Sequence, residues 1–166
     1  SSGVGTTTTL MVGIALLLGP VWLVPRDIAH RTVRTDGLAR FAAAGVLTAY
    51  AWLAVTGALL LAWGLEPGAH YDAAVHAFFT GFVFSAIMAH EPIIAPSVTG
   101  LAFAYTPLLY APLVLLEAAL LARVGADLAL LTEVRRWSGL LQVIAILLFL
   151  ALSAGSVLRA RHQGSS

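Results

Sequence analysis

The sequence predicts an all-α integral membrane protein, a bundle of five transmembrane helices, from two observations. Hydrophobic residues make up 60% of the 166 residues and charged residues only 10%, whereas soluble domains contain about 25% charged residues. The chain also contains five apolar runs of roughly 20 residues, the length that an α-helix needs to cross a bilayer. Because lipid offers no hydrogen bonds to the backbone, runs of this length are expected to be helices.

The five predicted spans form one membrane-embedded domain with short connections. They cover about residues 6–24, 41–65, 73–94, 98–122 and 137–158. The first span opens on four threonines, and a four-helix bundle results if this segment is peripheral. Pro92 and Pro96 are expected to break the third helix, with a short re-entrant turn there as an alternative. Residues 1–3 (SSG) and 164–166 (GSS) are interpreted as vector-derived and are left out of the fold.

Composition also limits the partners of the protein. The lipid bilayer is the expected partner, a homo-oligomer is left open, and a net charge of +1 predicts no nucleic-acid partner. All nine basic residues are arginines, six on the side of the 26–40 loop and the C-terminal tail and three on the other. The positive-inside rule therefore predicts an outer N-terminus and a cytoplasmic C-terminus, in a bacterial inner membrane. No nucleotide-binding loop, zincin motif or serine-nucleophile elbow identifies an enzyme.

The third span carries two histidines within "HAFFTGFVFSAIMAHE", which runs from His76 to Glu91. Fourteen residues of α-helix turn through about 1400°, within about 40° of four full turns. His76 and His90 are therefore expected on one face, near opposite membrane surfaces. Ionisable groups inside a membrane usually face the bundle interior and indicate a functional site.

Glu117 in the fourth span is expected at the depth of His76 and in contact with it. This layout predicts one cluster of His70, Asp72, His76 and Glu117, and a second of His90 and Glu91 with His30 in reach. The chain has no cysteine, and imidazole and carboxylate ligands suit Cu, Zn or Fe, whereas haem requires an axial ligand such as histidine. The predicted haem or metal ligands are His76 and His90, with Asp72, Glu117, His70 and Glu91 as further metal ligands.

Three functions follow from these residues. The first is haem or metal binding in a redox or gas-response role. The second is a proton-coupled transporter or channel-like protein with His76, Glu117, His90 and Glu91 as relay groups. The third is a structural or assembly subunit whose polar groups fix helix packing. Trp52 is interpreted as an interface or lipid-facing residue, and Gly45, Gly57 and Gly81 as small residues that allow close helix approach.

Two resemblances bear on the haem hypothesis. The histidine spacing resembles that of cytochrome b, in which one helix supplies ligands to two haems, but no other predicted span contains a histidine. Residues 71–100 (YDAAVHAFFTGFVFSAIMAHEPIIAPSVTG) resemble uncharacterised bacterial multi-pass membrane proteins loosely related to the NnrS-like haem- and copper-containing nitric-oxide-response group. His76, Gly81 and His90 match this pattern, and Glu91 departs from it. The resemblance implies that His76 and His90 are haem or metal ligands.

Overall fold

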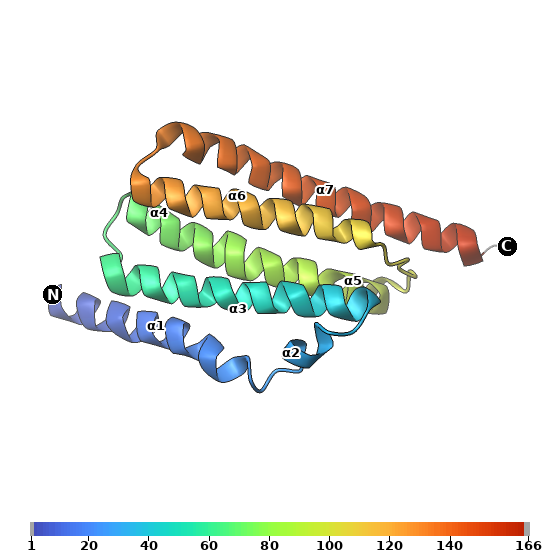
Figure 1. Cartoon of the computed structure of the whole chain (residues 1–166), viewed down its shortest axis with the longest axis horizontal. Coiled ribbons are helices and arrows are strands. Elements are labelled where there is room, and N and C mark those ends of the chain that lie inside the picture. Colours follow the sequence, from blue (N-terminus) through green and yellow to red (C-terminus); the bar gives the residue numbers. More distant parts are fainter. Residues whose placement is uncertain (1, 165–166) are drawn as a thin grey trace.

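The structure is a computed structural model that describes residues 2–164, and five long helices lie side by side in it (Figure 1). They are α1 (Ser2–Leu23), α3 (Gly37–Trp63), a continuous helix of three segments, α6 (Tyr110–Ala129) and α7 (Thr132–Gly164). The three segments are α4 (Ala69–His76), the π-helical η1 (Ala77–Phe84) and α5 (Ser85–Thr99). Each long helix is long and apolar enough to cross a membrane. The chain is thus an all-α integral membrane protein, and α1 counts as its first span.

Two short elements lie at the same end of the bundle. The helix α2 (Ala29–Thr32) lies in the first loop, and the 3₁₀ turn η2 (Pro107–Leu109) opens α6. This end is called the α2 end, and the opposite end, where α6 turns into α7, is called the turn end (Figure 1).

The third helix is longer than predicted, because Pro92 and Pro96 lie inside it and do not break it. Each proline removes one backbone donor, which a membrane helix tolerates when neighbouring groups satisfy the freed carbonyl. The helix ends instead at Gly100, whose φ of 68° is the left-handed conformation that glycine adopts most readily. The fourth span therefore begins at Pro107 and not near residue 98. As a result, each residue of α6 lies at a different depth in the bundle from the one predicted.

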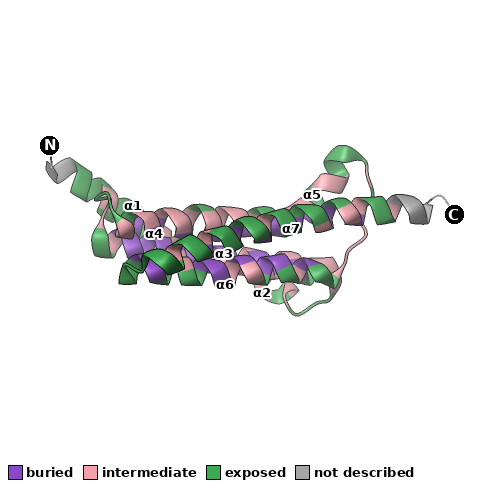
Figure 2. Ribbon diagram, turned by 90° about the horizontal axis from the view of Figure 1, so that it is seen from above, coloured by how far each residue is buried: buried purple, intermediate pink, exposed green. Residues whose placement is uncertain are grey.

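The three central helices bury the core, and the outer two cover its flanks. Helix α1 packs on α3 and α7 packs on α6, with α4–η1–α5 in contact with both α3 and α6. Figure 2 shows buried residues along α6 and largely exposed ones along α7. One apolar cluster lies toward the turn end (Trp52, Leu59, Leu60, Ala73, Ala74, Ala77, Leu120 and Val124), and another toward the α2 end (Phe41, Met88, Leu109, Leu113, Leu116, Ala145 and Phe149).

Glycines allow α3 to approach its neighbours closely, as predicted. A Cβ atom on Gly57 would lie 2.5 Å from the backbone nitrogen of Leu17 in α1, and one on Gly45 would lie 2.8 Å from the Cβ of Ala89 in α5. A side chain on Gly81 would overlap the indole of Trp52. Trp52 is only 6% exposed, so its interpretation as an interface residue was wrong: it packs over the glycine in the core.

The π-helical segment η1 changes which way the two histidines face. A π-helix bonds i→i+5 and so has about 4.4 residues per turn, which makes eight residues lag about 145° behind an α-helix. The prediction that His76 and His90 share a face is therefore wrong. His76 lies beside Asp127 of α6, whereas His90 lines a pocket with residues of α2 and α3.

Candidate functional site

Two aspartates and two arginines form an ion-pair network at the turn end. Arg123 of α6 places Nη2 2.5 Å from Asp72 Oδ2 and Nε 3.1 Å from Asp127 Oδ2. Arg135 of α7 places Nη2 2.6 Å from the same Asp72 oxygen and Nε 2.5 Å from Asp127 Oδ1. Asp127 is fully buried. The network joins α4, α6 and α7, and its two positive charges balance its two negative ones.

His76 completes a group that has the composition of a metal site. The candidate ligand atoms of Asp72, His76 and Asp127 all lie within 4.8 Å of one another. However, both carboxylates already pair with Arg123 and Arg135, and a divalent cation would be repelled by these two guanidinium groups. The His76 Nδ1 atom lies 2.8 Å from the backbone oxygen of Asp72 and 3.5 Å from its carboxylate. The geometry therefore favours an ion-pair network here over a metal centre.

Two predicted members of this cluster lie elsewhere. The ring of His70 stacks on Trp63 with centroids 4.9 Å apart and planes at 2°. The Glu117 carboxylate accepts hydrogen bonds from Ser85 Oγ at 2.6 Å and from Trp52 Nε1. Ser85 lies nine residues beyond His76, on the far side of the whole π-helical segment η1. The predicted contact of Glu117 with His76 is wrong, because α6 begins later than predicted and Glu117 lies deeper in the bundle.

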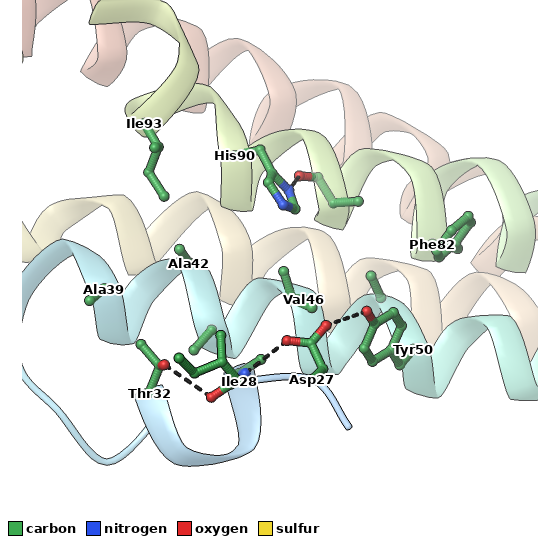
Figure 3. Close-up of a pocket in the computed structure, with 14 residues that line it drawn as sticks. Asp27, Ile28, Thr32, Ala39, Ala42, Val46, Tyr50, Phe82, His90 and Ile93 are labelled. Carbon is green, nitrogen blue, oxygen red and sulfur yellow. Dashed lines mark hydrogen bonds between the residues drawn. The ribbon is translucent and has the colours of Figure 1, made fainter. Parts of the chain in front are cut away.

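His90 lies beside a pocket of about 450 Å³ near the α2 end. Figure 3 shows the imidazole reaching from α5 towards α3, with Asp27 and Tyr50 across the pocket. Most of the lining is apolar, and five of the lining residues are alanines of α3 or α5 (Ala39, Ala42, Ala43, Ala49 and Ala86). The pocket thus combines an apolar slot with a few polar groups, the usual composition of a small-molecule site.

The tautomer of His90 follows from its hydrogen bond. Its Nδ1 atom lies 2.7 Å from the backbone oxygen of Ala86, and a carbonyl only accepts hydrogen bonds, so Nδ1 carries the proton. In the neutral imidazole, Nε2 is then left with its lone pair. Among the described residues, this bond to Ala86 is the sole hydrogen bond that His90 makes. The Nε2 lone pair is therefore available to a ligand.

Asp27 fixes the first loop against α3 at the opposite wall of the pocket. Its carboxylate accepts hydrogen bonds from Tyr50 Oη at 2.5 Å and from the backbone nitrogen of Ala29 at 2.8 Å. These two bonds, with smaller effects from the nearby His30 and His90, lower the pKa of Asp27 below its ordinary value of 3.8. Sequence reasoning missed Asp27, because a carboxylate in an arginine-rich loop has the pattern of a solvated charge.

The second predicted cluster is divided in the structure. His30 contacts the backbone oxygen of Asp27 through Nδ1 and, like His90, lies near the Asp27 carboxylate. Glu91 accepts a hydrogen bond from Ser153 of α7 at 3.1 Å, on the other side of α5. In the part of the chain that the structure describes, these histidines and carboxylates do not form a three-ligand metal group.

Comparisons with known proteins identify a family. No curated protein and no solved structure matches the chain. A family model described as a domain of unknown function, DUF8744, matches residues 3–158, which include the first four spans and all but the last two residues of the fifth. The chain therefore belongs to the DUF8744 family.

Proposed function

We propose that this membrane protein binds haem through His90, in the pocket between α2, α3 and α5. The observation that carries the proposal is the imidazole of His90, held by the Ala86 carbonyl with Nε2 free beside an apolar pocket. Histidines that bind metals commonly donate their other ring N–H to a carbonyl or carboxylate, which fixes the tautomer and the ring orientation. His90 has this arrangement, with Nδ1 against the Ala86 oxygen.

The lining of the pocket favours haem over a bare metal ion. A Cu, Zn or Fe ion bound by the protein needs three or four ligand atoms, whereas haem brings four nitrogens of its own and needs an axial ligand. His90 supplies one such atom, and alanines leave room for a flat apolar ring. The resemblance of residues 71–100 to the NnrS-like group agrees with His90 as a ligand. His76 is not included, because the arginine network surrounds it.

The proposed role is the binding of a small gas or the transfer of electrons. Haem held by His90 would supply gas binding or electron transfer, and the polarity and access of the surrounding pocket would decide between the two. The arginine bias supports an orientation with the α2 end, and hence the pocket, facing the cytoplasm. Single cysteines at Thr35 and Gly68 test this on intact cells: an impermeant thiol reagent should label Gly68→Cys and leave Thr35→Cys unlabelled.

Absorption spectroscopy tests the haem proposal. The purified full chain, mixed with haem in detergent, should develop a Soret band that His90→Ala abolishes and His76→Ala retains. Ala42→Phe should also weaken binding, because it fills the pocket and leaves His90 in place. Circular dichroism checks that each variant remains helical. The proposal is overturned if the parent takes up no haem, if His90→Ala binds it as well as the parent, or if stoichiometric Cu or Zn is found in its place.

A further inference from the structure

Glu117 is a carboxyl group in the middle of α6, held by two other helices. It lies seven residues after the start of α6 and twelve before its end. Its two oxygens are used separately: Oε1 accepts from Ser85 of α5 at 2.6 Å and Oε2 accepts from Trp52 of α3. Ser85 is fully buried, and Trp52 is 6% exposed. The three side chains lie where the two apolar clusters of the core meet.

No cation accompanies this carboxyl group among the described residues, in contrast to the carboxylates of the turn end. Its partners from α3 and α5 are neutral, and α4, η1 and α7 contribute no charged partner to it. The charged groups of the neighbouring helices are engaged elsewhere: Asp72 and Arg135 in the turn-end network, and Glu91 with Ser153. An ionised group at this depth without a counter-charge is costly, and such groups commonly serve proton or ion movement.

The two hydrogen bonds suit both protonation states of Glu117. The indole N–H of Trp52 only donates, so it requires that Oε2 stays an acceptor. The hydroxyl of Ser85 both donates and accepts. Ser85 can therefore donate to Oε1 when Glu117 is ionised and accept from it when Glu117 is protonated. A proton moves onto or off Oε1 with a rotation of one hydroxyl, and no bond between heavy atoms changes.

We propose that Glu117 is a proton-binding site inside the membrane, with Ser85 as the hydroxyl that follows its protonation. The proton comes from water and returns to it, without oxidation or reduction. This function is separate from haem binding at His90, because Glu117 lies on α6, which contributes no residue to the pocket of His90. Glu117 would give the protein a proton-accepting group between the α2 end and the turn end of the bundle. A purely structural role for its two hydrogen bonds would not require this group to change its protonation.

Infrared difference spectroscopy tests the proposal on the full chain in liposomes, without haem. A carbonyl-stretching band of a protonated carboxyl group should appear and disappear as the pH is stepped. Glu117→Gln should abolish this band, because glutamine keeps both hydrogen bonds through its oxygen and its amide group but exchanges no proton. The matched control is Glu91→Gln, which alters the other serine-bonded carboxyl group and should leave the band in place.

A second variant keeps the test decisive if Glu117→Gln does not assemble. Ser85→Ala retains the carboxyl group and removes one partner, so the band should persist at a shifted frequency. The proposal is overturned if the parent shows no pH-dependent band, if Glu117→Gln retains the band, or if Ser85→Ala leaves its frequency unchanged. Since these measurements use haem-free protein, their failure leaves the test of His90 unaffected.

Discussion

The surroundings of His76 and His90 differ, although both rings are held in the same way. In each case Nδ1 bonds the backbone oxygen four residues earlier, at 2.8 Å for His76 and 2.7 Å for His90. His76 faces a closed network of two aspartates and two arginines, whereas His90 faces an apolar pocket. The tautomer alone therefore does not identify a ligand. The balanced charge network beside His76 stabilises helix packing. The Nε2 lone pair of His90, which accepts no hydrogen bond and lies beside an apolar pocket, favours the binding of a small molecule.

The largest expected effect is the loss of a charge from the network near His76. Asp127→Asn leaves two arginines facing one aspartate, and the uncompensated buried charge should destabilise the fold by about 3–5 kcal/mol. The double variant Asp127→Asn/Arg135→Gln restores the balance and should recover part of this loss. Thermal unfolding in detergent measures both. Equal stability of the parent and Asp127→Asn would show that the network contributes nothing to the turn end.

A smaller effect is expected from shortening η1, the segment that separates the faces of the two histidines. Deleting Phe79, which is 57% exposed, removes one residue from the π-helical segment and should turn α5 by about 80° relative to α4, at about 4.4 residues per turn. The rotation moves His90 out of the pocket, so haem affinity should fall more than about tenfold. Tenfold is the lower end of the loss in affinity observed when the groups that orient a metal ligand are removed. The control Phe79→Ala keeps the length of η1 and should bind haem as the parent does. Equal Soret titrations for the two variants would contradict this role of η1.

The smallest effect concerns Asp27, at the far wall of the His90 pocket. Its pKa is lowered in the folded state, so its ionised form stabilises the fold above the ordinary pKa of 3.8, and this stabilisation is lost as the pH falls through the folded-state value. Tyr50→Phe removes the main cause and should cost about 1 kcal/mol at neutral pH. Its melting temperature should therefore depend less on pH in the acid range than that of the parent.

The control for this last prediction is Tyr71→Phe, which changes an exposed tyrosine remote from Asp27. It should keep the parent's acid sensitivity. If Tyr50→Phe and Tyr71→Phe lose stability in parallel as the pH falls, the bond between Tyr50 and Asp27 does not govern the acid response.

The fold class could be predicted because lipid sets simple requirements: five apolar runs of sufficient length have to be helices. The site could be predicted only in part. His90 stood out as a polar group in an apolar run, but the run Ala77–Phe84 contains no signal that distinguishes π-helical from α-helical bonding. That choice accompanies the packing of Trp52 over Gly81, a contact between distant parts of the chain. Arg135 and Asp127 were missed because their importance lies in their pairing across helices.

The ion-pair network also bears on how the protein is made. Helices α1 and α3 form a hairpin that can pack through Gly57 as soon as both have left the ribosome, before the rest of the chain exists. Asp72 enters the membrane next, and its two partners follow later in the chain, on α6 and α7. A chain cut short before Arg135 would keep a carboxylate without one of its counter-charges. We expect such a product to be recognised by membrane quality control, because Asp72 would lack its partner on α7.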